Sequence, residues 1–133
     1  MTRPTLVVAA AVIIRDGRFL VTRRPAGVHL EGHWEFPGGK CEPGETLAEC
    51  LTRELREELA VYSEVRGAVL TTAHDYPDRR VELHFIRCKI LGEPRPQQGQ
   101  EMRWVPRSAL PGLKFPPADE ELIQLLVGGS APR

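Results

Sequence analysis

The feature that most constrains the fold is a glycine-rich loop leading directly into an acidic helix, over residues 39 to 61. Thr46 followed three residues later by Glu49 forms a capping box, so we expect the helix to begin at Leu47. Leucines at every fourth position give this helix one apolar stripe for a core, Leu47, Leu51, Leu55 and Leu59. The sequence therefore predicts a helix that packs one face and leaves the other polar.

Three glutamates lie together on that polar face. Glu54, Glu57 and Glu58 are spaced i, i+3 and i+4, which brings their side chains to one side of the helix. Like charges at this spacing oppose helix formation, so their presence indicates a cation that binds between them. Carboxylate oxygens favour a hard ion, and we expect Mg²⁺, with Mn²⁺ as the alternative.

The overall charge points away from polymeric partners. The chain has 133 residues, which predicts one domain over residues 1–133, and its 18 basic and 18 acidic residues cancel. With no global field we expect neither a nucleic acid nor a membrane partner. Between residues 42 and 58 six acids stand against two arginines, while further arginines gather at residues 15–24 and 79–80, a distribution that suits an anionic, metal-bound substrate. Charge counts alone favour the simpler interpretation of solvated faces.

The cysteines and the first apolar run indicate the cellular compartment in which the protein is expected. Cys41, Cys50 and Cys88 are odd in number and contain no CxxC pair, so we expect neither a disulfide framework nor a zinc knuckle. This pattern fits a reducing compartment, and we expect a cytoplasmic protein. The apolar run of residues 5–14 is too short to span a bilayer and continues into a second strand. A buried strand is the better interpretation than a signal peptide.

The rest of the chain reads as strands with one further helix. Asp16-Gly17 predicts a hairpin turn, and Gly67 a bend within a long strand. We expect an α+β fold, a mixed sheet flanked by helices, ending in a loose tail over residues 128–133. The expected strands cover residues 6–14, 19–23, 34–36, 61–72, 81–91 and 102–105, and the last helix covers residues 117–126.

The spacing within the loop and helix can now be compared with known signatures. The spacing resembles the Nudix box of hydrolases that cleave nucleoside diphosphates linked to another group. It consists of Gly39, a gap of five residues, Glu45, a gap of seven residues, and the run from Arg53 to Glu58. One position departs from this signature, because Ala60 stands where a helix-closing glycine is usual. We expect Ala60 to leave the helix by a different exit. The acidic run alone would indicate only a charged surface helix; the spaced glycines and Glu45 reverse that interpretation.

The resemblance extends over most of the chain to the MutT-like branch and to its relatives that hydrolyse cytidine triphosphates. It implies a Nudix-type αβα sandwich and water attack on a nucleoside triphosphate, releasing nucleoside monophosphate and pyrophosphate. The implied substrate is an oxidised nucleotide such as 8-oxo-dGTP, with CTP or a modified cytidine triphosphate as the alternative. The matching segments are residues 22–24, 34–40, 76–79, 92–94 and 115–119.

Other functions remain open at this level. A Nudix domain that binds nucleotides without hydrolysing them is one, although the intact Arg53 and three glutamates argue against it. Hydrolysis of ADP-ribose, NADH or a dinucleotide polyphosphate is another. We expect a monomer or a homodimer.

The resemblance also assigns roles around the box. Glu54, Glu57 and Glu58, with the carbonyl of Gly38, are expected to hold the metal. The expected catalytic residues are Glu54, Glu57, Arg53 and Glu45. Arg53 would orient the glutamates, and Glu45 would brace the loop by reaching Arg53. The alternative for Glu45 is a solvated loop acid.

Substrate residues are expected on both sides of the box. Arg24, Lys40 and Arg79 would grip phosphates, although each suits an ordinary surface cation equally well. Phe36 would stack on the base, with core packing as the alternative. Asp119 would select the base, with a helix-dipole role as the alternative.

One further position departs from the MutT-like pattern. Gln98 lies six residues before Trp104, where a metal-binding or basic glutamate is usual, and a glutamine accepts no proton at neutral pH. We expect that either the nearby Glu101 replaces it or a box glutamate, Glu57, acts as the base.

Overall fold

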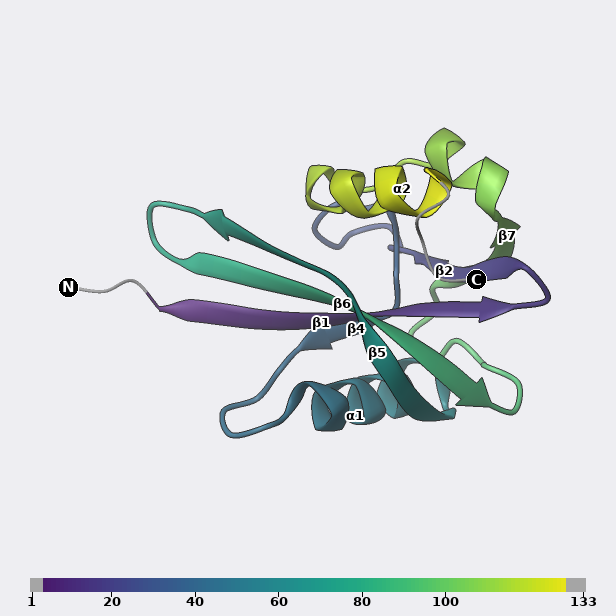
Figure 1. The fold of residues 1–133 in the computed structure, drawn as a ribbon, viewed down its shortest axis with the longest axis horizontal. Helices are drawn as coiled ribbons and strands as arrows, with labels where there is room; N and C mark the ends of the chain where they lie inside the picture. The colour runs from purple at the N-terminus through teal and green to yellow at the C-terminus, as the bar shows by residue number, and fades with distance from the viewer. Residues whose placement is uncertain (1–3, 129–133) are drawn as a thin grey trace.

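The computed structural model describes residues 4–128, and Figure 1 shows their arrangement around one twisted sheet. The elements in chain order are β1 Thr5–Arg15, β2 Arg18–Arg23, β3 Trp34–Glu35, β4 Gly38–Lys40, α1 Leu47–Leu59, β5 Tyr62–Asp75, β6 Arg80–Leu91, β7 Glu101–Pro106, the 3-10 helices η1 Arg107–Gly112 and η2 Pro117–Asp119, and α2 Glu120–Val127.

The sheet is mixed and is organised around β1. This strand pairs in parallel with β6 along most of its length, and β6 pairs antiparallel with β5. On its other side, β1 pairs antiparallel with β4 near its middle and with β2 at its end. β3 and β7 both pair with β2, which completes a seven-stranded sheet among the described residues. The mixed sheet expected from the sequence is confirmed.

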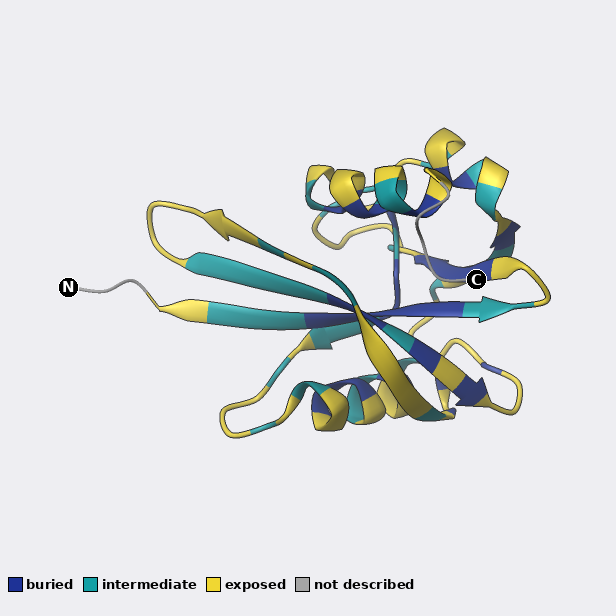
Figure 2. Cartoon of the chain, viewed as in Figure 1, coloured by how far each residue is buried: buried dark blue, intermediate teal, exposed yellow. Residues whose placement is uncertain are grey.

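The two faces of β1 feed two separate cores, because alternate side chains of a strand point to opposite faces. Ala9, Ala11 and Ile13 pack with the buried leucines of α1. Ala10 and Val12 pack on the other face, with Leu122 and Leu126 of α2 among their neighbours. Figure 2 shows the buried residues concentrated along the middle of β1 and on the inward sides of both helices. The expected α+β sandwich, with a helix on each face, follows directly.

Several local predictions are confirmed. Asp16 and Gly17 adopt φ angles of 52° and 74°, the left-handed turn that joins β1 to β2. The Thr46 hydroxyl accepts from the Glu49 backbone, and the Glu49 side chain accepts from the Thr46 backbone, so the capping box is complete. The register of β5 shifts between Val65 and Gly67, where a bend was expected.

The last helix differs from the expected continuous helix over residues 117–126. Its start is the 3-10 turn η2, and α2 begins only at Glu120. Prolines at 116 and 117 supply no backbone donors, and Asp119 has φ −93° and ψ −5°, which ends the tight turn before regular α geometry begins. The 3-10 helix η1 was not anticipated, because it is short and contains Pro111. Most of the expected tail lies outside the described residues.

The helix exit was predicted wrongly. Ala60 has φ 54° and ψ 38°, and its N–H bonds to the Arg56 carbonyl. This is the left-handed closure that a glycine usually makes, so the alanine occupies the ordinary exit rather than a different one.

The cysteine prediction also needs correction. Cys41 and Cys50 form a disulfide, with their Cα atoms 5.1 Å apart, while Cys88 is free and buried. Counting cysteines missed this pair, since the turn that ends at Thr46 folds residue 41 back against the first turns of α1. No helix within residues 4–128 is long and apolar enough to cross a bilayer.

Candidate active site

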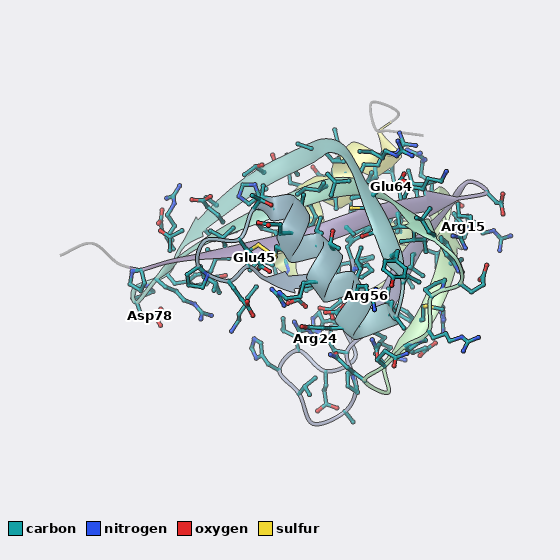
Figure 3. The ribbon with its side chains drawn as sticks, turned by 90° about the horizontal axis from the view of Figure 1, so that it is seen from below. Arg15, Arg24, Glu45, Arg56, Glu64 and Asp78 are labelled. Carbon is teal, nitrogen blue, oxygen red and sulfur yellow. A yellow bond between two sulfur atoms is a disulfide. The ribbon has the colours of Figure 1, made fainter. Side chains whose placement is uncertain are left out.

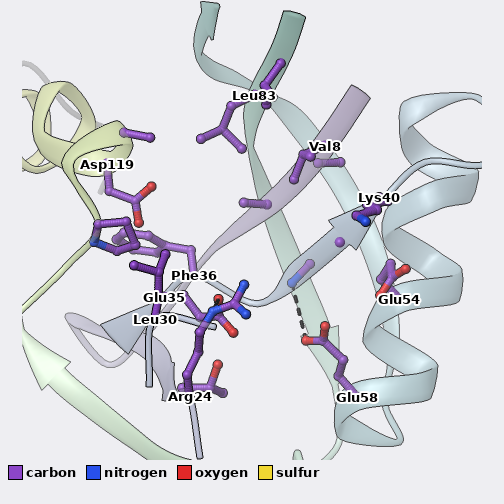
Figure 4. Close-up of a pocket in the computed structure, with 18 of the residues that line it drawn as sticks. Val8, Arg24, Leu30, Glu35, Phe36, Lys40, Glu54, Glu58, Leu83 and Asp119 are labelled. Atoms are coloured by element: carbon purple, nitrogen blue, oxygen red, sulfur yellow. Dashed lines mark hydrogen bonds and ion pairs between the residues drawn. The ribbon is translucent and has the colours of Figure 1, made fainter. Parts of the chain in front are cut away.

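A cleft of 690 Å³ lies on the sheet between α1 and the start of the C-terminal helical segment. Its floor includes side chains of β1 and β6, such as Val8 and Leu83. Figure 4 shows Glu54 and Glu58 on the α1 side of the cleft and Asp119 on the opposite side, with Glu35 and Arg24 between them. The cleft therefore brings the acidic face of α1 and the end of the chain to one place.

Arg53 ties the helix to the loop before it. Its guanidinium donates to both carboxylate oxygens of Glu45, at 2.7 and 3.0 Å, and to the Lys40 carbonyl at 2.9 Å. It also donates to Glu54 at 2.8 Å and to Glu57 at 3.4 Å. The hydrogen bonds that Arg53 donates lower the pKa of Glu45 to about 2, and donating to Glu45 and Glu54 raises the pKa of Arg53. Glu45 thus contacts Arg53, as its expected bracing role requires.

Figure 3 shows α1 from below, with Glu45 beside one end of the helix and Arg56 near the other. Glu57 is the most exposed of the three glutamates expected to hold a metal, with 57% of its side chain accessible. Glu54 is largely covered by Arg53 and the loop, with 14% accessible.

The loop and the helix approach closely at the glycines. The Gly38 N–H donates to Glu58 at 3.4 Å. A Cβ on Gly39 would lie 2.5 Å from the Glu54 carboxylate and would displace that side chain, whereas a Cβ on Gly38 would lie 2.0 Å from the Ala9 carbonyl oxygen, so only glycine fits at residue 38. Burial raises the pKa of Glu58 to about 8, assisted by the neighbouring charges of Glu54 and Glu35. Burial also raises the pKa of Glu54, against the effect of Arg53. These carboxylates are held in surroundings that disfavour their negative charge.

Such surroundings suit a cation. Oxygen donors dominate the α1 side of the cleft, and a hard divalent ion prefers oxygen. Desolvated carboxylates that repel one another are stabilised in their charged form by a bound cation. Among residues 4–128, no three His, Cys, Asp or Glu side chains are already arranged to hold an ion; Glu54 accepts a hydrogen bond from Arg53 and Glu58 accepts one from Gly38. The chemistry of the donor set fits a hard divalent ion.

The expected phosphate ligands reach the same cleft. Arg24, Lys40 and Arg79 all line it. Arg24 is also held in place from within the protein, donating to Glu35 at 3.0 Å and to the His29 carbonyl at 3.3 Å. The structure therefore brings these three cations to one cavity, from three separate segments of the chain.

Phe36 and Asp119, the two residues expected to contact the nucleotide base, differ in how they face the cleft. Phe36 lines the cleft but is buried, with one face stacked on Phe115 at 5.3 Å between centroids and its ring edge-on to Phe85. It forms part of the wall rather than a free stacking platform. Asp119 is 7% exposed, and its side chain does not cap α2. Burial, together with the charge of Glu35, raises the pKa of Asp119 to about 7.

Sequence reasoning gave no role to Glu35, which lines the centre of the cleft. Burial raises the pKa of Glu35, and the Arg24 guanidinium partly offsets that effect. The available signal was its place beside Trp34: in a strand, alternate residues face opposite sides, so a buried tryptophan directs its neighbour outward.

Gln98, Gln100 and Glu101 bear on which acid could act in place of the glutamate expected at residue 98. Gln98 and Gln100 line the cleft, and Gln100 donates to the Glu58 carbonyl at 3.2 Å. Glu101 instead pairs with Arg23 and Arg103, and it does not line the cleft. Of the two alternatives for the missing acid, Glu101 is therefore the weaker, since its side chain pairs with arginines outside the cleft.

Comparison with known proteins gives this site a family. The model of the NUDIX domain family matches residues 9–125. This chain belongs to the Nudix family. It is 34% identical to the 8-oxo-dGTP diphosphatase of Escherichia coli K12 over 123 residues, covering 91% of this chain and 95% of that protein. It is 36% identical to the CTP pyrophosphohydrolase of the same strain over 129 residues, covering 95% and 94%.

A solved structure supports the same assignment. The solution structure of the E. coli ORF135 protein superposes with a TM-score of 0.86 at 32% identity, covering 98% of this chain and 95% of that one. The chain is thus a Nudix nucleotide pyrophosphohydrolase with a MutT-like fold. Nudix enzymes typically use a divalent metal, which agrees with the donor set on α1.

Proposed function

We propose that this Nudix enzyme hydrolyses nucleoside triphosphates to nucleoside monophosphate and pyrophosphate, with 8-oxo-dGTP as its first substrate. The observation that carries the proposal is the cleft itself, which places the carboxylates of α1 at one end and a buried acid, Asp119, at the other. A triphosphate bound by the first end would present its base to the second. We further propose that residues 1–133 act as one domain in the bacterial cytoplasm, as a monomer or a homodimer, without nucleic acid or membrane.

Glu54, Glu57 and Glu58, with the Gly38 carbonyl, would hold Mg²⁺, and Mn²⁺ would serve in its place. When bound, the ion neutralises phosphate charge and lowers the pKa of a coordinated water. Arg53 orients Glu54 and Glu57 through its hydrogen bonds, and Glu45 fixes Arg53 from the loop side. We assign to Glu57 the proton of the attacking water, because it is the most accessible of these acids and Arg53 holds it beside Glu54, although Glu57 itself lies outside the lining of the cleft.

Cations beyond the glutamate face would position the phosphates. Arg24 lies between the two ends of the cleft. Lys40, at the end of β4, and Arg79, in the turn between β5 and β6, also line it. A guanidinium can hold two phosphate oxygens at once, so Arg24 and Arg79 favour one orientation of the chain of phosphates. Glu35 keeps Arg24 in place through their ion pair.

Asp119 would read the base. A protonated carboxyl both donates and accepts a hydrogen bond, which suits the edge of an oxidised guanine. An ionised carboxylate only accepts, which suits the exocyclic amine of cytosine. The pKa of Asp119 near 7 allows the protonated form at neutral pH, and this favours 8-oxo-dGTP. CTP and modified cytidine triphosphates are the second candidate, since both kinds of relative are similarly close to this chain.

A substrate panel tests the proposal. We expect kcat/KM in Mg²⁺ to be highest for 8-oxo-dGTP, followed by CTP, when both are compared with dGTP and dCTP. Asp119→Asn should shift the ratio of kcat/KM for 8-oxo-dGTP and CTP by about tenfold or more, since one buried hydrogen bond is worth roughly 1–3 kcal/mol. An unchanged ratio in the folded variant would show that Asp119 does not contact the base.

A further inference from the structure

The disulfide joins the two halves of the catalytic motif. Cys41 follows β4 directly, and Cys50 lies in the first turns of α1, nine residues later in the sequence. β4 carries Gly38 and Gly39, while α1 carries the glutamates. The bridge therefore links the strand that supplies a backbone ligand to the helix that supplies the carboxylates.

Noncovalent contacts hold the same junction from both sides. The Lys40 carbonyl accepts from Arg53, and the Gly38 N–H donates to Glu58. The Cys50 sulfur lies 3.8 Å from the Gly39 carbonyl oxygen. With Gly39 in tight contact with Glu54, a small shift of this strand relative to α1 changes the positions of the groups expected to bind metal.

The two cysteines differ in burial. Cys50 is completely buried, whereas Cys41, as a whole residue, is only partly buried against the same core. The third cysteine, Cys88, is buried in the same core, and burial raises the pKa of its thiol to about 12, which keeps it unreactive. A reagent in solution would therefore meet Cys41 first.

We propose that Cys41 and Cys50 are a reversible redox modification site whose closed form fixes β4 against α1 and tightens divalent-metal binding at the glutamate face. The metal part of this inference rests on the proposed function. Closure needs an oxidant, and we assign a low-molecular-weight disulfide such as oxidised glutathione. The Cys41 thiolate attacks that disulfide and releases one thiol. The Cys50 thiolate then attacks the Cys41 sulfur and releases the second, so two protein thiols are oxidised while one small disulfide is reduced to two thiols.

The open form should keep its fold and its chemistry, because Arg53 still clamps the loop. The site would then tune metal affinity rather than switch the enzyme on and off. For an enzyme that clears oxidised nucleotides, closure under oxidising conditions would strengthen metal binding when such nucleotides are most abundant.

The test compares metal-free protein equilibrated with reduced or with oxidised glutathione. After oxidation, alkylation under denaturing conditions should modify one cysteine, and after reduction all three. Reduction should lower the Tm by roughly 5–10 °C, since the bridge restricts the unfolded chain. Reduction should also weaken Mn²⁺ binding, followed by electron paramagnetic resonance without substrate, by on the order of 3–10-fold.

Two variants complete the design. The double variant with Cys41→Ser and Cys50→Ser should have the reduced protein's Tm and Mn²⁺ affinity under both conditions. Cys88→Ala should keep the full redox response. Three alkylated cysteines after oxidation, or a Tm and Mn²⁺ affinity that ignore glutathione, would overturn the inference. Failure of the substrate panel alongside a redox-dependent Tm and Mn²⁺ affinity would instead count against the proposed substrate and leave this site supported.

Discussion

At the scale of single residues, the carboxylates of this chain differ by their surroundings. Glu45 accepts two hydrogen bonds from Arg53 and has a lowered pKa, whereas the partly buried Glu58 and the buried Asp119 have raised pKa values. Desolvation without a full counter-charge favours the protonated acid. The folded protein thus opposes the charge of these two acids of the cleft and favours the charge of Glu45 on the loop.

Asp119 makes this contrast measurable. Its pKa rises from 3.8 to about 7 on folding, so the folded state holds a proton that the unfolded chain releases. Its contribution to the free energy of unfolding is therefore largest below about pH 4 and is lost as pH rises through about 7. Between about pH 4 and 7, Asp119 should lower the wild-type free energy of unfolding by on the order of 2–4 kcal/mol. We expect this decrease to be absent in Asp119→Asn. Urea unfolding of both proteins without metal, from pH 4 to 8, measures the difference.

The comparison of the two proteins isolates Asp119, because Glu35 and Glu58 titrate in both. A constant gap between the two stability curves over this range would mean that Asp119 titrates alike in the folded and unfolded chains.

At the scale of elements, the start of α1 has favourable capping, whereas its end includes a strained backbone conformation. The capping box satisfies the first backbone donors, while Ala60 adopts a left-handed conformation that costs an L-residue roughly 1–2 kcal/mol. We expect Ala60→Gly to raise the free energy of unfolding by about 0.5–1 kcal/mol, less than the full strain because glycine gains entropy in the unfolded chain. The matched control Ala48→Gly, on the exposed side of α1, should lower stability by a similar amount.

Urea denaturation of the two glycine variants checks this expectation. A loss of stability in Ala60→Gly would show that the helix leaves by another path in solution. The activity of Ala60→Gly should stay near wild type, because residue 60 does not line the cleft.

Elements and their ends also show what the sequence could predict. The apolar run of β1 and the leucine stripe of α1 specify their own partners, so both elements were predicted closely. The 3-10 turn η2 was not, because Pro117 suits the first turn of either helix type. The pairing of Cys41 with Cys50 depends on the tightness of one turn, which spacing alone does not reveal.

At the scale of the whole molecule, β1 lies between two cores, and the cleft lies beside it. The α1 side of the cleft carries the motif from the first half of the chain, and the opposite side carries Asp119, near the end of the chain. The residues within the motif could be predicted, since their spacing is local. The direction of the Glu101 side chain could not be predicted, because it depends on the pairing of β7 with β2, which is a property of the assembled sheet. The alternation of Glu35 with Trp34 could have predicted that its side chain points away from the core, but only the assembled sheet places it in the cleft.

We propose that the glutamate face of α1 carries out metal-dependent release of pyrophosphate. Phosphorus NMR of the products formed from 8-oxo-dGTP tests it, using wild type with Mg²⁺, wild type with EDTA, and Glu57→Gln. The exposed Glu57 can change without disturbing the core, so stability should hold while kcat falls about 10²-fold or more. Glu64→Gln, on the exposed strand β5, is the matched control and should retain full activity. We expect equal amounts of monophosphate and pyrophosphate, formed only with metal. Near wild-type turnover by Glu57→Gln at saturating Mg²⁺ would contradict the assignment of this mechanism to the glutamate face.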